Sequence, residues 1–352
     1  MRKIISRLAA FLRLILNPRQ MKGETYFPEK PRKNILRIYF EQLLHSLKYG
    51  EINRYYYVYG MDVVGKKDSD YMDYYSFYRL RNKMNMTKPY NYICLLQDKR
   101  LFGVFASFYG LQTASNVATI HDGVLSEPIV DVLLKHNHLF CKPVDSLCGN
   151  GVFELLYHDG EYYLDAKKIS YDSLLQYIKS LKGDIIMQPY VEQHKEISAI
   201  NDKCINTVRI VTVNPNKSEN PDDVVILASL LRIGVNDMNV DNWAKGGLVV
   251  GIDRDGTLMK YGFYKPGHGT KTEKHPDSGV VFEGREIPMY DELERQVKFF
   301  HSKLNGIYTI GWDVAITNNG PLFIEGNDNY ELGFLQTCFG GMRSVFEKYL
   351  IK

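Results

Sequence analysis

The stretch Gly311-Trp312-Asp313-Val314-Ala315-Ile316, followed by Leu322-Phe323-Ile324-Glu325-Gly326-Asn327, decides the fold of this 352-residue chain. Asn318-Asn319-Gly320 lies between the two runs, and Asn-Gly between apolar runs favours a tight β-hairpin. We therefore expect Tyr308–Ile316 and Pro321–Glu325 to form adjacent antiparallel strands. Apolar neighbours on both sides of the acidic residues indicate that these strands are buried.

Three polar side chains on this hairpin form a candidate cation site. Asp313 and Glu325 fall on the two strands, and Asn327 follows Glu325 by two residues. Residues two apart on an extended chain face the same side of a sheet. Two carboxylates and a carboxamide on one face offer the oxygen ligands that Mg²⁺ prefers. The alternative is a pair of acidic edge residues facing water, which the apolar neighbours disfavour.

A lysine followed by a glycine loop forms a second candidate site. In Phe140–Val152, Lys142 ends an apolar run and a loop with Gly149 and Gly151 follows. Glycines let backbone N–H groups approach a phosphate closely, and a lysine supplies a positive charge. The spacing fits neither a P-loop nor a dinucleotide-binding motif. Taken alone, such a pattern is more often structural.

The segment Ile185–Glu192 is a third candidate. It is an apolar run that passes into a connector containing Pro189, with Glu192 and Glu196 at or just beyond its end. Backbone groups at such a connector can read the edge of a purine, and a carboxylate can hold ribose hydroxyls. Nothing local requires this interpretation.

The rest of the chain has an α+β pattern with antiparallel hairpins rather than a regular alternation of strands and helices. Residues 33–50 and about 68–86 have helical patterns, and Gly50 ends the first. From about residue 90 short apolar runs, beginning with Tyr92–Leu96, alternate with helices. The strand-like runs are Leu139–Val144, Ile185–Met187, Arg209–Val213, Val224–Leu231 and Leu248–Ile252. Asp253-Arg254-Asp255-Gly256 predicts a further turn.

These segments, in this order, resemble the ATP-grasp superfamily over about residues 95–345, and most closely its sugar-transfer-associated branch, which occurs among genes for bacterial surface polysaccharides. The stretches that carry the resemblance are Lys142-Pro143-Val144-Asp145, Asn206–Thr212, Asn242–Gly247, Gly311–Ala315 and Ile324–Asn327. The resemblance implies an α+β ATP-grasp fold, in which two α+β subdomains clasp ATP, with an N-terminal helical extension.

The resemblance also implies which residues bind ATP. Lys99 and Lys142 would contact the phosphates, and the loop Ser146–Gly151 would close over them through Ser146, Gly149 and Gly151. The adenine would lie against Gln188, Tyr190 and Val191. Glu196, with Glu192 as the alternative, would hold the ribose. Arg209 would reach the γ-phosphate or an acyl phosphate, so Arg209 and Lys142 would be catalytic. Asp313, Glu325 and Asn327 would bind one or two Mg²⁺.

The implied activity is ATP-dependent ligation of a carboxylate and an amine through an acyl phosphate. Such a reaction needs positioning and charge neutralisation rather than a side-chain nucleophile. The carboxylate would be a uronic acid or a related group in bacterial capsule or surface polysaccharide biosynthesis. Two other functions stay open: a phosphotransferase acting on a sugar hydroxyl, and a non-catalytic nucleotide-binding partner of a glycosyltransferase. The joint presence of Lys142 and the three hairpin residues argues against the last.

The histidines give weaker signals. His136 and His138 supply two metal ligands without a third, which argues against zinc. His268, His275 and His301 lie in the stretch where the acceptor would bind, and one of them could serve as a base for the amine. Histidines in such positions are more often structural.

The N-terminal arm is basic and amphipathic. Residues 1–22 hold six basic side chains and no acidic one, and apolar residues recur at helical spacing up to Asn17-Pro18. The longest apolar run is far too short to span a bilayer, and Arg7 and Arg13 interrupt any signal-peptide core. The arm either packs on the body or lies on the anionic inner face of the cytoplasmic membrane.

Charge and cysteine content narrow the class of protein. Residues 1–37 carry a charge of +8, so with a net charge of +3 the remaining chain carries −5, which argues against nucleic-acid binding. Five cysteines without paired spacing favour a reduced, cytoplasmic protein.

We expect the chain to divide into five parts. They are a basic arm and linker (1–32), a helical, Tyr-rich leader (33–90), the N-terminal part of the core (91–135), a small glycine-loop subdomain (136–190) and a C-terminal Mg-ATP and acceptor subdomain (191–352).

Overall fold

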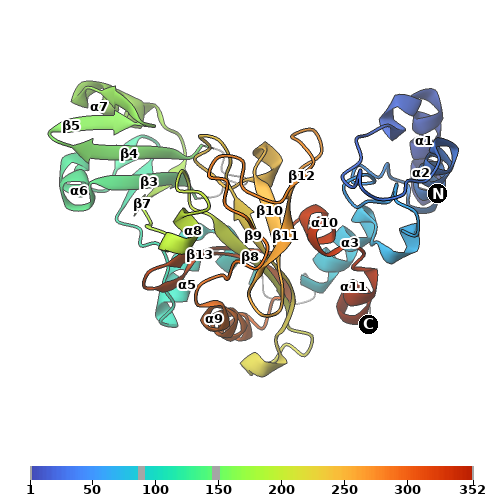
Figure 1. Cartoon of the computed structure of the whole chain (residues 1–352). Helices are drawn as coiled ribbons and strands as arrows, with labels where there is room; N and C mark the ends of the chain where they lie inside the picture. The colour runs from blue at the N-terminus through green and yellow to red at the C-terminus, as the bar shows by residue number, and fades with distance from the viewer. Residues whose placement is uncertain (1, 86–91, 145–150, 351–352) are drawn as a thin grey trace.

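The computed structural model describes residues 2–85, 92–144 and 151–350. Two seven-stranded antiparallel sheets lie between residues 118 and 327, with helices before, between and after their strands (Figure 1). The predicted α+β class with antiparallel hairpins is confirmed. Within the described ranges, no helix is both long and apolar enough to cross a lipid bilayer.

The C-terminal sheet has the strand order β12-β11-β10-β9-β8-β13-β14. Its strands are β8 (Thr207–Val213), β9 (Val225–Ile233), β10 (Leu248–Ile252), β11 (Leu258–Tyr264), β12 (Lys271–Thr272), β13 (Thr309–Thr317) and β14 (Gly320–Asn327). β13 and β14 form the predicted hairpin, with Asn318-Asn319 as its two-residue loop. The turn Asp253–Gly256 connects β10 to β11 as predicted.

A β-bulge in β14 decides which side chains of the hairpin face the core. Asp313 pairs with Glu325, whereas the next residue, Val314, pairs with Phe323, so Ile324 is an extra residue in the ladder. Side chains alternate along a strand, and an extra residue changes that alternation. As a result Phe323 lies in the core, while Glu325 faces the same side as Asp313.

The small sheet has the strand order β2-β1-β7-β3-β4-β5-β6. Its strands are β1 (Ala118–His121), β2 (Val124–Leu125), β3 (His138–Pro143), β4 (Phe153–His158), β5 (Glu161–Leu164), β6 (Lys167–Ile169) and β7 (Asp184–Pro189). The helices α6 (Ile129–His136) and α7 (Tyr171–Ser180) pack on this sheet, and Leu139, Phe153 and Leu174 belong to their shared core.

Both faces of the C-terminal sheet are covered, and every residue of β8 and β13 is buried. One face packs through Trp312 and Phe323 against the helices α5 (Lys99–Phe108) and α9 (Tyr290–Lys303). The other face contacts α10 (Gly333–Phe339) and the N-terminal region. The remaining helices of the body are α4 (Cys94–Gln97), α8 (Lys195–Ser198) and α11 (Arg343–Leu350). The apolar run Tyr92–Leu96 therefore overlaps a short helix.

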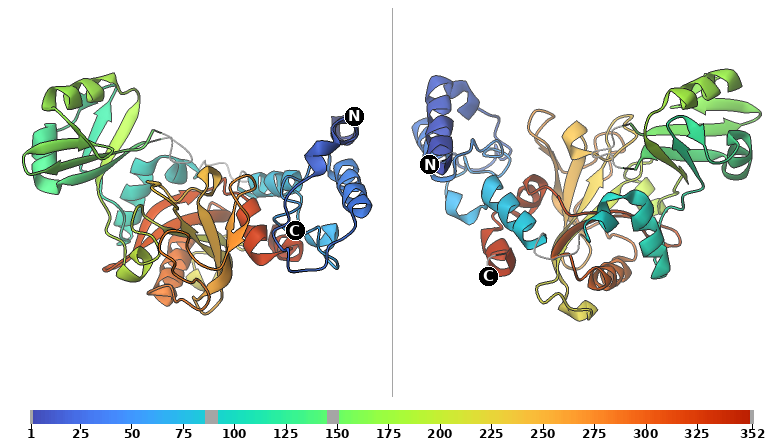
Figure 2. Two further views of the ribbon diagram at one scale, coloured as in Figure 1. Left: turned by 45° about the horizontal axis from the view of Figure 1, so that its top comes forward. Right: turned by 180° about the vertical axis from the view of Figure 1, so that it is seen from behind.

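The N-terminal region contains α1 (Arg2–Leu16), α2 (Ile35–Tyr49) and α3 (Tyr74–Asn85). The side chain of Asn34 accepts a hydrogen bond from the Arg37 N–H and caps α2, and Gly50 ends it at a φ of 79°, which glycine adopts without strain. α1 lies beside α2 at the end of the molecule opposite the small sheet, as both views of Figure 2 show.

Residues 50–85 attach this region to the C-terminal sheet. Phe77 on α3 is fully buried, with its ring 5.7 Å from that of Tyr330 and 5.0 Å from that of Phe346. The buried guanidinium group of Arg81 donates hydrogen bonds to the backbone oxygen of Tyr330 and to the side chain of Asn329. The leader and the body therefore share one hydrophobic core.

We expect Phe77→Ala to lower the free energy of unfolding by about 3–5 kcal/mol, because it removes a fully buried ring from this shared core. Urea unfolding measures the change. Phe108→Ala is the matched control: its ring is 77% exposed on α5, and its loss should cost about 0.5 kcal/mol or less. Equal values for the two variants would show that the leader does not depend on this packing.

Candidate functional site

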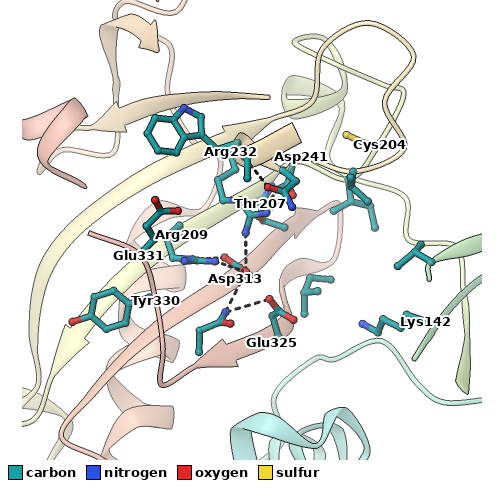
Figure 3. A pocket seen from close by; sticks show the side chains of 18 of the residues that line it. Lys142, Cys204, Thr207, Arg209, Arg232, Asp241, Asp313, Glu325, Tyr330 and Glu331 are labelled. Carbon is teal, nitrogen blue, oxygen red and sulfur yellow. Dashed lines mark hydrogen bonds and ion pairs between the residues drawn. The ribbon is translucent and has the colours of Figure 1, made fainter. Parts of the chain in front are cut away.

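A cavity of about 1020 Å³ lies between the two sheets and the leader (Figure 3). It brings together most of the residues predicted from the sequence. Those that line it are Lys99, Lys142, Gln188, Tyr190, Val191, Arg209, Asp313, Glu325 and Asn327. The sequence segments that supply them lie up to 228 residues apart, so the fold gathers them into one site.

The hairpin residues face the cavity together. The Asn327 side-chain nitrogen lies 3.2 Å from an oxygen of Glu325 and 3.4 Å from an oxygen of Asp313. The cross-strand pairing of Asp313 with Glu325 and the two-residue spacing from Glu325 to Asn327 explain this arrangement, because they put all three side chains on one face. In the described part of the chain, no group of three or more His, Cys, Asp or Glu side chains could hold a metal ion. The predicted set has two carboxylates and an amide, and its metal role stays a prediction.

Two arginines hold the carboxylate of Asp313. Arg209 donates from Nε and Nη2 at 2.5 and 2.7 Å, and Arg232 donates from Nη1 at 2.9 Å. Burial raises the pKa of Asp313, but the two guanidinium groups outweigh burial and hold that pKa well below its usual range. Asp313 is therefore ionised, and Arg209, which pairs with it in the β8–β13 register, is fixed beside it.

Arg232 and Asp241 complete this network and were missed from the sequence. Arg232 also donates to Asp241 at 2.8 Å, and Asp241 accepts from the backbone N–H and the hydroxyl of Thr207 at 2.9 and 2.5 Å. Two arginines and two aspartates thus balance one another in charge. A charged residue directly after the apolar run Val224–Leu231 was the signal that could have identified Arg232.

Lys142 reaches into the cavity from β3. Its side chain points toward Glu325 in Figure 3 and is 7% exposed. Among the described residues, its ammonium group has no hydrogen-bond or ion-pair partner. Burial lowers the pKa of Lys142 to about 8, against the opposing effect of Glu325. Burial and the neighbouring carboxylate of Asp313 raise the pKa of Glu325.

The predicted adenine residues form the wall nearest β7. The Gln188 side chain donates to the backbone oxygen of Ala114 and to the side chain of Asn116, both at 2.9 Å. The ring of Tyr190 stacks on His138 with 4.2 Å between ring centroids. These contacts fix the wall in one orientation. Lys99 lines the cavity nearby, where its ammonium group donates to the backbone oxygen of Val144 at 3.1 Å.

The predicted ribose and loop residues are placed less favourably. Glu192 and Glu196 are exposed and do not line the cavity, and Glu196 accepts a hydrogen bond from Arg285 at 3.1 Å. Their ribose role stays a prediction. Ser146 and Gly149 lie outside the described residues. Gly151 is described and has a φ of 71°, which suits a glycine.

The leader supplies the wall opposite the small sheet, which was not predicted. The residues it contributes are Arg54, Tyr55, Tyr74 and Tyr78. The Tyr55 ring stacks on Trp243 with 6.2 Å between centroids, and the Tyr55 hydroxyl donates to Glu331. The leader therefore forms part of the site as well as covering the sheet.

The three histidines considered as bases do not line this cavity. His275 and His301 are buried, and each has a ring nitrogen within hydrogen-bond distance of a backbone oxygen, that of Gly234 and that of Ile307. Burial lowers the pKa of His301 to about 4, so its ring is neutral at pH 7. Both histidines are parts of the packed interior.

Comparison with known proteins agrees with the fold. The family model described as sugar-transfer associated ATP-grasp matches residues 78–347. No curated sequence matches the chain significantly. Among solved structures, the ATP-grasp ligase PsnB with precursor peptide PsnA2 and AMPPNP has a TM-score of 0.41 at 11% identity, over 76% of this chain and 60% of that one. D-alanine–D-alanine ligase from Bacillus anthracis has a TM-score of 0.40 at 9% identity, over 73% and 68%.

The chain spans about three fifths of the length of the PsnB ligase, and these low scores carry no argument about activity. The family match does carry an argument, because it covers most of the chain. The matched residues include the cavity-lining residues of both sheets. This protein belongs to the sugar-transfer-associated ATP-grasp family.

Proposed function

We propose that the protein is an ATP-dependent ligase that joins a carboxylate to an amine through an acyl phosphate. The observation that carries the proposal is the opposition of Lys142 to Glu325 across one cavity that Asn327 also lines. The lysine is cationic, buried and without a partner among the described residues, so it suits phosphate oxygens. The family match supports ATP as the phosphate donor.

The charges of the hairpin fit Mg²⁺. Arg209 and Arg232 pair with Asp313 and Asp241, so Glu325 is the hairpin carboxylate that lies outside these ion pairs. Burial and the neighbouring carboxylate of Asp313 raise the pKa of Glu325, and a bound cation would favour its ionised form. Glu325 and Asn327 would hold the ion, with Asp313 beside them, and the ion would neutralise phosphate oxygens of ATP.

The residues of this chain have separate tasks in the proposed reaction. The γ-phosphoryl group passes from ATP to a carboxylate oxygen, which yields ADP and an acyl phosphate. An amine then attacks the carbonyl carbon, loses a proton and displaces inorganic phosphate. Lys142 would bind ATP phosphates in the ground state, whereas Arg209, fixed by Asp313, would stabilise charge that develops during transfer.

The proposed substrate is a uronic acid or a related carboxylate of a bacterial capsule or surface polysaccharide, in keeping with the sugar-transfer association of the family. The enzyme would act in the cytoplasm. A phosphotransferase on a sugar hydroxyl is the second candidate. Its products would be ADP and a phosphorylated sugar without free phosphate.

We expect the wild-type protein to release phosphate from ATP only when both a carboxylate and an amine are present. Screening uronic acids and their nucleotide sugars against a panel of amines, with an amide detected by mass spectrometry, tests this. Glu325→Gln removes one charge from the hairpin and should cut turnover by about 100-fold or more. The control Glu161→Gln changes an exposed carboxylate on β5 and should keep full activity. A phosphorylated sugar without free phosphate would identify the phosphotransferase instead.

We expect the affinity for ADP to fall as the pH rises above about 8, where Lys142 loses its proton. Bound phosphates favour the protonated lysine and raise its pKa, so binding should weaken by up to about tenfold per pH unit between the two pKa values. Calorimetric titration at pH 7, 8 and 9 measures this. Lys142→Arg keeps its charge over that range and should give a flatter profile. Parallel profiles for the two proteins would contradict the role of Lys142.

We also propose that residues 1–22 hold the enzyme on the inner face of the cytoplasmic membrane. On α1 the apolar side chains of Ile5, Leu8 and Leu12 are 59%, 51% and 53% exposed. Leu14 is fully buried, so one side of α1 packs against its neighbour α2 and the opposite side offers an apolar stripe. α2 likewise exposes Phe40, on the side away from its buried residues. Basic side chains beside such a stripe favour anionic lipid.

We expect full-length protein to sediment with vesicles of phosphatidylcholine and phosphatidylglycerol, and the triple variant Ile5→Ser, Leu8→Ser, Leu12→Ser to stay in solution. These residues are exposed, so the substitutions should leave the fold intact. Deleting the whole arm would not, because it would also remove the buried side chain of Leu14. Each basic side chain near the lipid contributes about 1 kcal/mol, so high salt should weaken binding. If both proteins sediment equally, or if neither does, α1 only packs against the rest of the protein and does not bind the membrane.

A further inference from the structure

A second cavity, of about 440 Å³, lies between α1 and residues 45–75 of the leader. Its lining from α1 is Ser6, Ala9, Ala10 and Arg13, and the segments 50–55 and 71–75 supply most of the remainder. Arg54, Tyr55 and Tyr74 line both this cavity and the first one. The two cavities therefore adjoin, with these three residues at their boundary.

The acidic groups of the second cavity are already engaged by the protein. The carboxylate of Glu51 accepts hydrogen bonds from the backbone N–H groups of Tyr74 and Tyr75, both at 3.1 Å, and lies 3.3 Å from the ring of His45. Asp73 accepts from the backbone N–H of Ser76 at 2.9 Å at the start of α3. Its other carboxylate oxygen has no hydrogen-bond partner among the described residues but lies 3.7 Å from a guanidinium nitrogen of Arg343. Each of the two carboxylates therefore has a basic side chain nearby, His45 for Glu51 and Arg343 for Asp73.

The two arginines of the cavity differ from the acids in this respect. The guanidinium groups of Arg13 and Arg54 have no hydrogen-bond or ion-pair partner among the described residues. Both are exposed, so their guanidinium groups meet solvent or a ligand. The second cavity therefore has two uncompensated positive charges, one on α1 and one at the boundary with the first cavity.

We propose that this second cavity binds the phosphate or diphosphate group of the carboxylate substrate, with Arg13 and Arg54 as its anion ligands. The proposal rests on the proposed ligase function. A planar guanidinium presents paired N–H donors that match phosphate oxygens, and charge-assisted bonds of this kind are strong. The volume suits a phosphorylated sugar.

The arrangement orders the substrate along the molecule. With its phosphate between α1 and the leader, the substrate passes Tyr55 and Tyr74, and its carboxylate enters the first cavity beside the hairpin. A sugar carries such a phosphate either as a soluble nucleotide sugar or as a lipid-linked diphosphate. The shared chemistry is a glycosyl phosphate or diphosphate, and the two sources can be told apart.

The first arm of the test is calorimetric titration of the full-length protein with inorganic pyrophosphate, with ADP present at saturation to fill the nucleotide end. We expect wild type to bind, and Arg13→Gln and Arg54→Gln each to weaken binding by about tenfold or more. Arg19→Gln is the matched control, since it removes the same charge from the same arm and Arg19 lines neither cavity. ADP binding by every variant verifies that the fold is intact.

The second arm measures binding to phosphatidylcholine vesicles that carry a polyprenyl diphosphate. If Arg13→Gln and Arg54→Gln lose binding to these vesicles but not to pyrophosphate, and Arg19→Gln does not, the substrate is lipid-linked. If the same two variants lose binding to pyrophosphate but not to the vesicles, the substrate is soluble. The proposal is overturned if wild type binds in neither arm, or if the two variants bind like Arg19→Gln in both. If the wild-type protein binds pyrophosphate but not ADP, the proposed ligase function is refuted instead.

Discussion

The carboxylate of Asp313, held by Arg209 and Arg232, is the interaction on which the rest of the site depends. A buried charge is tolerated only with partners in good geometry, and here those partners come from two other strands, β8 and β9. A register slip of one residue in either strand would turn a guanidinium group to the opposite face and leave Asp313 alone. The ion network therefore selects the register of β8, β9 and β13, and the hairpin register then places Glu325 opposite Asp313.

The hairpin could be predicted from the sequence because its signals are local. Asn-Gly, apolar runs and two acids at matching positions all lie within 17 residues. The bulge at Ile324 could not be predicted, since nothing distinguishes this residue from its apolar neighbours, and simple alternation would have placed Phe323 on the face of Glu325. The family resemblance supplied Arg209, but Asp241 becomes a site residue only through the strand order.

The leader shows the same division between local and long-range signals. The apolar spacing over residues 33–50 and Gly50 at its end predict α2 closely. The place of Tyr55 in the cavity wall depends instead on Trp243, which lies 188 residues further along the chain and whose ring stacks on it. Tyr59 is a packing residue, because its ring stacks between those of Tyr55 and Tyr71.

The division of the first cavity between leader and body has an evolutionary consequence. Of its described residues, the leader contributes Arg54, Tyr55, Tyr74 and Tyr78 to the wall of this cavity, and none of these four belongs to the ion network or to the hairpin. Mutations in the leader can therefore alter which molecule fits while the ion network and the hairpin remain unchanged. An N-terminal segment that can change independently of the ion network gives one protein scaffold a simple way to accept different molecules.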